Sequence, residues 1–186
     1  MKKFIVFFIV FATVGSLSAQ KSYRFESQFH AGMLEGQRGT ALQLLSINGI
    51  SKGQWFTGVG TGFDWYHLRS IPLFLSVNKR FYKGDRGFLA ALDGGLNFPW
   101  GRKRDLIQNG LIEDKFKPAL YWTGGLGYRI TMKNKKDAFM ILVGYSFKHI
   151  KEEQIKPTIC GFVSCNISEY YNYKLSRMSF RLSWVF

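Results

Sequence analysis

The sequence has few of the residues that carry metal or redox chemistry. It holds two cysteines and three histidines. The histidines, His30, His67 and His149, are scattered and lack the close spacing of metal ligands. Cys160 and Cys165 are separated by four residues, which is not a Cys-x-x-Cys motif. We therefore expect neither a metal site nor a cofactor.

Long apolar runs are missing beyond the amino-terminal segment. Lys2 and Lys3 precede the apolar-rich stretch 4–14, which is shorter than the roughly 20 residues that a membrane-spanning helix needs. The small residues that follow provide a cleavage site after Ala19. This pattern is typical of a secretory signal peptide, so we expect residues 1–19 to be removed, with an uncleaved anchor as the alternative.

The sequence also lacks a linker rich in Pro, Gly and Ser, and no change of composition divides it after the signal. Residues 20–186 have the length of one domain, and we expect them to form a single one.

What the sequence has in abundance is alternation of apolar and polar residues, and 17% of its residues are aromatic. The segment 176–186 shows the alternation best, because Leu182, Trp184 and Phe186 share one face while Arg177 and Arg181 share the other. Seven further segments alternate over about ten residues, the length of a tilted membrane strand. They are 24–34, 39–48, 54–66, 71–82, 87–98, 120–132 and 138–150.

These eight segments predict an all-β fold, an eight-stranded antiparallel up-and-down transmembrane β-barrel. The connections 49–53, 83–86 and 133–137 are short and polar, whereas 99–119 and 151–174 are long. Short turns at one end and long loops at the other are typical of outer-membrane barrels, whose apolar faces meet lipid. The alternative is a soluble exported barrel with its apolar faces turned inward around a ligand.

Two segments carry a resemblance to a known family. Residues 71–78, Ile-Pro-Leu-Phe-Leu-Ser-Val-Asn, and 88–98, Phe-Leu-Ala-Ala-Leu-Asp-Gly-Gly-Leu-Asn-Phe, together with the Ser-Ala-Gln signal end and the aromatic carboxyl terminus, resemble small outer-membrane barrels, the OmpA/OmpX-like barrel domains. The resemblance implies recognition of Phe186 by the barrel assembly machinery. That family includes anchors, adhesins and proteins without known activity, so we expect a monomeric, non-enzymatic protein of the outer membrane.

Charged residues fall on the predicted inner faces. An unpaired charge in a narrow lumen is costly, so we expect ion pairs, with Glu26 near Arg181 and with Asp93 between Arg80 and Arg129 on the adjacent strands. Eight strands leave little room for an open channel, which favours a packed polar lumen over a narrow pore. The predicted lumen network comprises Glu26, Asp64, Asp93, Arg80, Arg129, Arg177 and Arg181.

One segment suggests an enzyme. Residues 144–151, Gly-Tyr-Ser-Phe-Lys-His-Ile-Lys, are similar to the surroundings of the active-site histidine in outer-membrane lipid A deacylases. Lys151 stands where those enzymes have their nucleophilic serine, and Ser146 is expected on the strand face opposite to His149. An acyl hydrolase needs a nucleophile beside its base, so we predict no catalytic residue and keep the deacylase as the alternative function.

The two long connections are the expected interaction surface. Formal net charge falls from +14 to +12 when Lys2 and Lys3 leave with the signal, and the surplus of Lys and Arg suits anionic phosphates such as those of lipopolysaccharide. A protein or matrix ligand is the other candidate, and no nucleic acid is expected. Cys160 and Cys165 are predicted to form a disulfide during export. The basic loop patch comprises Arg102, Lys103, Arg104, Lys115 and Lys117.

Overall fold

The computed structural model describes residues 23–36, 39–66, 69–99, 113–160 and 163–186. Only the backbone is described for 113–116, 154–160 and 163–167. The expected signal peptide, 1–19, lies outside the described residues. Within the described ranges, no helix is long and apolar enough to cross a membrane.

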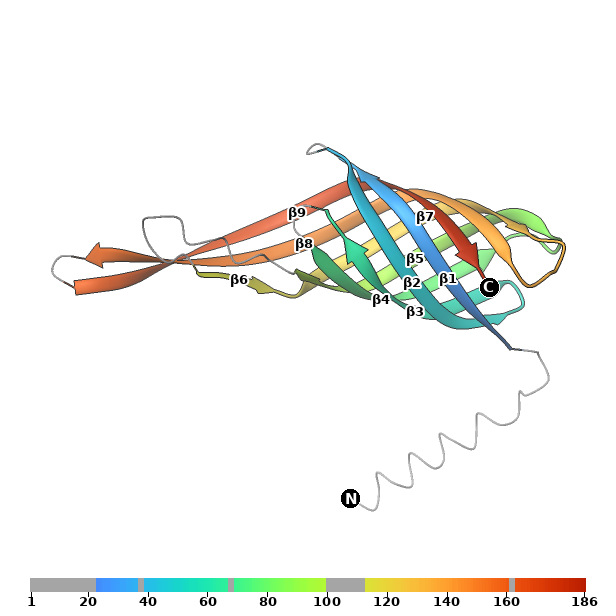
Figure 1. Ribbon diagram of the computed structural model, residues 1–186, viewed down its shortest axis with the longest axis horizontal. Coiled ribbons are helices and arrows are strands. Elements are labelled where there is room, and N and C mark those ends of the chain that lie inside the picture. The colour runs from blue at the N-terminus through green and yellow to red at the C-terminus, as the bar shows by residue number, and fades with distance from the viewer. Residues whose placement is uncertain (1–22, 37–38, 67–68, 100–112, 161–162) are drawn as a thin grey trace, which may run out of the picture.

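The described chain is built from antiparallel strands (Figure 1). They are β1 (Arg24–Glu35), β2 (Ala41–Lys52), β3 (Trp55–Asp64), β4 (Ser70–Arg80), β5 (Arg86–Pro99), β6 (Glu113–Lys117), β7 (Ala119–Thr131), β8 (Ala138–Cys160) and β9 (Val163–Val185). All of them except β6 form a ring in sequence order, because β9 pairs with both β8 and β1. The chain is a closed eight-stranded antiparallel β-barrel, which confirms the predicted fold class.

The barrel closes where its first and last strands meet. Ser27 and Phe186 exchange two backbone hydrogen bonds of 2.9 Å, and the β1–β9 ladder continues to the pair Glu35–Met178. The guanidinium of Arg24 donates to the carbonyls of Lys135 and Lys136 in the turn before β8. Closure leaves no unpaired edge within the ring.

The second strand is longer than the sequence predicted. β2 runs through Lys52, so the turn expected at 49–53 is wrong, and the loop is Gly53 and Gln54. Gly53 has φ +60°, which suits glycine at the first position of a two-residue hairpin loop. Leu44 faces outward while Leu45 is buried inside, so alternation is kept. The inner face of β2 carries Leu45 and Ile47 beside the polar residues Gln43 and Ser51.

The long connection expected at 151–174 is mostly strand. β8 and β9 are 23 residues each and stay paired far beyond the ring, to Cys160 and Val163. β6 adds to the β8 side of this extension. Figure 1 shows the hairpin projecting from one end of the barrel with β6 beside it, while the short turns lie at the other end. An antiparallel pair can continue past a barrel because its backbone groups satisfy one another.

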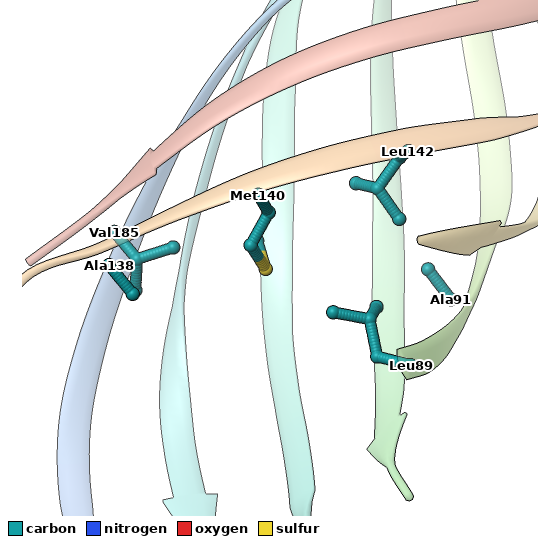
Figure 2. Packing of buried hydrophobic residues seen from close by; sticks show 6 residues of the cluster. All are labelled: Leu89, Ala91, Ala138, Met140, Leu142 and Val185. Carbon is teal, nitrogen blue, oxygen red and sulfur yellow. The ribbon is translucent and has the colours of Figure 1, made fainter. Parts of the chain in front are cut away.

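The lumen is filled, and not only by polar groups as the sequence suggested. Leu45, Ile47, Phe56, Phe74 and Tyr121 form one apolar cluster inside the barrel. Figure 2 shows a second cluster, in which side chains of β5, β8 and the end of β9 face one another. It comprises Leu89, Ala91, Ala138, Met140, Leu142 and Val185.

Candidate functional site

The first lumen ion pair joins β1 to β7. Arg129 donates to Glu26 from both terminal nitrogens, Nη1 to Oε1 at 2.9 Å and Nη2 to Oε2 at 3.3 Å. Arg80 of β4 lies 3.9 Å from the same carboxylate, and Gln28 donates to it at 2.9 Å. The Glu26 side chain is 3% exposed. A buried carboxylate with two arginines and an amide around it is fully compensated.

The second ion pair joins β5 to β9. Arg181 Nη1 donates to Asp93 Oδ2 at 2.7 Å, and the Ser76 hydroxyl donates to the other carboxylate oxygen at 2.7 Å. Both charged side chains are buried. His30 lies on the adjacent wall, where its Nδ1 shares a hydrogen bond with the Ser183 hydroxyl.

The partners differ from those expected between neighbouring strands. Asp93 pairs with Arg181 rather than with Arg80 or Arg129, and Glu26 pairs with Arg129 rather than with Arg181. Around the ring, each pair joins strands that are three positions apart. Long inward side chains in a narrow barrel meet at its centre, so a partner on the facing wall lies closer than one on the adjacent strand.

A third ionic cluster closes the end of the lumen near the projecting hairpin. Lys148 of β8 donates to Asp64 of β3 at 2.5 Å and to the Ser70 hydroxyl at 2.8 Å. The Tyr66 ring lies over this cluster, 4.8 Å from the Lys148 ammonium and 4.4 Å from the Arg177 guanidinium. Lys148, an inward-facing residue outside the predicted network, therefore provides the partner of Asp64.

Arg177 has a different role from the other lumen arginines. Its Nη1 donates to the carbonyls of Leu34, at 3.3 Å, and Gly39, at 2.8 Å. These carbonyls lie at the end of β1 and just before β2. Arg177 thus ties β9 to the β1–β2 connection instead of pairing with a carboxylate.

The hydroxyl of Ser70 also belongs to this cluster, and it donates to Asp64 Oδ1 at 3.4 Å. Lys148 pairs with the same carboxylate and donates to Ser70, and a protonated lysine has no lone pair with which to accept the Ser70 proton. Ser146 is buried in the lumen and hydrogen-bonds with Thr123 at 3.2 Å, whereas His149 lies on the opposite face of β8. His149 is therefore not placed to accept a proton from Ser146.

The outside of the ring is an apolar belt. All eight barrel strands carry large apolar side chains on their outer face, among them Phe29, Leu75, Leu126, Val143 and Leu182. Each is between 43% and 67% exposed, the opposite of what a water-soluble fold with a hydrophobic interior requires. The in–out pattern therefore follows the membrane alternative and not the soluble one.

Aromatic residues border the belt at both ends, as two girdles. The girdle near the short turns comprises Trp55, Phe81, Phe88, Tyr128 and Trp184, and the girdle near the hairpin comprises Phe63, Trp65, Trp122, Tyr145 and Phe147. Lys79 extends along the first girdle, with its ammonium 5.0 Å from the Trp55 ring centroid and 5.6 Å from that of Phe81. Aromatic girdles and a lysine reaching past them are typical of lipid boundaries.

The projecting hairpin carries polar and aromatic residues. Tyr170, Tyr171, Asn172 and Lys174 of β9 are exposed, and the rings of Tyr171 and Tyr173 stack at 6.3 Å. A groove of about 750 Å³ lies where the hairpin leaves the ring. Its lining includes Glu35, Tyr145, Asn172, Tyr173, Lys174 and Arg177.

The predicted basic patch is only partly described. Lys117 is exposed, but its ammonium pairs with Glu153 at 3.1 Å, which offsets its charge. Arg102, Lys103 and Arg104 lie outside the described residues, and Lys115 is described by its backbone alone.

The strand register brings the backbones of the two cysteines close together in the hairpin. Cys165 pairs with Thr158, and Cys160 lies two residues beyond Thr158 on β8, opposite Val163. Two positions along the ladder separate the two residues, so their backbones are diagonal neighbours. Their side chains lie outside the described part, and the disulfide stays a prediction.

Comparison with known proteins adds little. No family model matches the chain, and no curated protein matches it. Among solved structures, the chain is similar to the outer membrane protein AlkL, determined by solid-state NMR in DMPC lipid bilayers. The sequences are 15% identical, the match covers 90% of each chain, and the TM-score is 0.41. The fold assignment therefore rests on the strand pairing itself.

Proposed function

We propose that this protein is a non-enzymatic integral protein of the outer membrane, with a closed lumen and an external hairpin that binds surface ligands. The observation that carries the proposal is the apolar belt, bordered by two aromatic girdles and wrapped around a charged interior. Exposing such a belt to water is unfavourable in free energy, whereas exposing it to lipid acyl chains is not.

The interior supports a structural role. Each acidic side chain of the predicted network, Glu26, Asp64 and Asp93, has a cationic partner inside the barrel. Apolar clusters fill the space between these pairs. An interior of this kind stabilises the barrel and leaves little room for solutes.

The hairpin is the proposed binding surface. Its exposed tyrosines and amides provide hydrogen bonds and flat apolar area, and Lys151 and Lys174 add exposed positive charge. Tyrosine is enriched at protein interfaces, and lysine suits phosphate. The candidate ligands are the phosphates of lipopolysaccharide and an external protein or matrix polymer. Recognition of Phe186 by the barrel assembly machinery belongs to the same proposal.

Membrane insertion is tested by fractionation and by gel migration with and without boiling. We expect the protein in the detergent extract of the outer membrane. Boiled and unboiled samples should migrate differently, because the gel detergent does not unfold the barrel unless the sample is heated. Recovery as a soluble periplasmic protein would contradict the proposal.

Ligand binding is tested with a shortened hairpin. A variant in which a short Asn-Gly turn replaces residues 151–172 joins the paired residues Ile150 and Tyr173, keeps the whole ring and should remain heat-modifiable. We expect it to lose binding to lipopolysaccharide-coated and matrix-coated surfaces, while Lys83→Ala, at the other end of the barrel, should bind like the parent. Equal binding by the shortened variant would rule out the hairpin.

A further inference from the structure

The apolar belt has one polar interruption, and it is confined to adjacent strands. Ser27 of β1, Ser46 and Asn48 of β2, and Thr57 and Thr61 of β3 point outward between the two girdles. We call this set the polar stripe. Outward positions between the girdles on the other five barrel strands carry apolar or aromatic residues or glycine.

The polar stripe is contiguous because strand register aligns it. Asn48 lies opposite Ser27 on one side and Val59 on the other, and Ser46 lies opposite Thr61. Along β2, the stripe falls between the exposed apolar residues Leu44 and Ile50. It therefore lies within the belt and not at a water boundary.

Hydrogen bonding inside the stripe is incomplete. The Ser27 hydroxyl donates to Asn48 Oδ1 at 2.7 Å, which leaves the Asn48 amide nitrogen with two hydrogens to donate. In the described part of the chain, no side-chain hydrogen bond joins Ser46, Thr57 or Thr61 to another residue. Hydrocarbon offers no partner to the Asn48 amide hydrogens or to the exposed hydroxyls of Ser46, Thr57 and Thr61, so these groups are costly in a bilayer.

We propose that the outer face of β1–β3 is a homodimer interface, in which the polar stripes of two copies pair within the membrane. The proposal rests on the membrane location proposed above. A dimer differs from the monomer that we expected from the sequence. The sequence alone did not indicate that these five residues share one surface.

The chemistry of the stripe favours a second copy over other occupants. Serine, threonine and asparagine each donate and accept hydrogen bonds, and the stripe carries no charge. A two-fold axis places a surface against itself, so a neutral, self-complementary set of donors and acceptors meets its own partners. A lipid chain at the same place would leave the Asn48 amide hydrogens and the hydroxyls of Ser46, Thr57 and Thr61 unpaired.

The surface beside the stripe has a shape suited to docking. An apolar groove of about 530 Å³ runs over the outer face from β2 across β1 to β9, and its lining includes Ala31, Met33, Leu42, Leu44, Phe180 and Leu182. Ala31 lies between Leu44 and Leu182 in the ladder, so a small residue separates two large ones. Small residues allow close approach of membrane segments, and the groove can take protruding side chains of the partner.

The test is sedimentation equilibrium of the refolded full barrel in density-matched detergent micelles, over a range of protein-to-micelle ratios. We expect a reversible dimer. The double variant Asn48→Leu/Thr61→Val removes polar groups from the face without changing the interior, and should weaken association roughly tenfold or more.

The matched control is Tyr128→Phe, which removes an outward hydroxyl from β7, four ring positions from β2. It should dimerise like the parent. A parent that stays monomeric at every ratio, or a dimer unaffected by Asn48→Leu/Thr61→Val, would overturn the interface. A chain that is soluble without detergent and not heat-modifiable would instead overturn the proposed membrane location.

Discussion

Glu26 on β1 and Arg129 on β7 form a two-point ion pair across the lumen, with both guanidinium nitrogens on the carboxylate. The two residues are 103 positions apart in sequence and lie on strands that do not pair with each other. The pair therefore joins two walls of the barrel, as Arg181–Asp93 and Lys148–Asp64 also do. Removing one member of such a pair leaves a buried charge.

We expect Arg129→Met to destabilise the barrel by about 3 kcal/mol, at the lower end for a broken buried pair because Arg80 remains within 3.9 Å of Glu26. Urea titration followed by unboiled gel migration measures the change. Glu26→Gln/Arg129→Met should regain part of the loss, since neither charge is then left buried. Arg86→Met, exposed at the start of β5, is the control and should stay within about 0.5 kcal/mol of the parent.

Gly60 makes room for the Phe74 ring in the lumen. A Cβ at position 60 would lie 2.4 Å from two ring carbons of Phe74 and 3.1 Å from Ile47. We expect Gly60→Ala to cost about 1–3 kcal/mol through overpacking, measured by the same urea titration. Gly94→Ala is the matched control, because nothing lies within 4 Å of that outward position. Equal stability of the two variants would show that the lumen is looser than described.

The parent protein should not conduct ions in planar bilayers. Arg181→Ala and Arg177→Ala should not conduct either, because the apolar clusters around Leu45 and Met140 still fill the barrel. Single-channel recording at fixed voltage is the measurement. Conductance in the parent that increases in either arginine variant would support the narrow pore instead.

Replacing His149 should leave lipid A unchanged. Its ring lies on the outer face of β8, whereas the Ser146 hydroxyl is buried in the lumen, so His149 cannot take a proton from that serine. Mass spectrometry of lipid A from cells that produce the parent or His149→Ala provides the measurement. Deacylated lipid A that disappears with His149→Ala would establish the alternative enzyme.

Several features of the site could be foreseen because strand alternation is a local property. Side chains two residues apart share a face whatever their distant partners, so Glu26, Asp64, Asp93 and Arg181 were expected inside, where the structure places them. The inward direction of the Leu45 side chain was harder to predict, because an apolar side chain can face either the lumen or the lipid.

The sequence by itself determined the strands and which side chains of each strand share a face, since both follow from a period of two. The exposure of the apolar faces in the structure decided which face is the outer one. Only the tertiary structure decided which charges pair, because partners on facing walls depend on how strands are tilted and staggered around the ring. It also decided that 151–174 forms a paired hairpin and that Ser27, Asn48 and Thr61 share one surface. Both depend on the register between strands, which no single strand encodes.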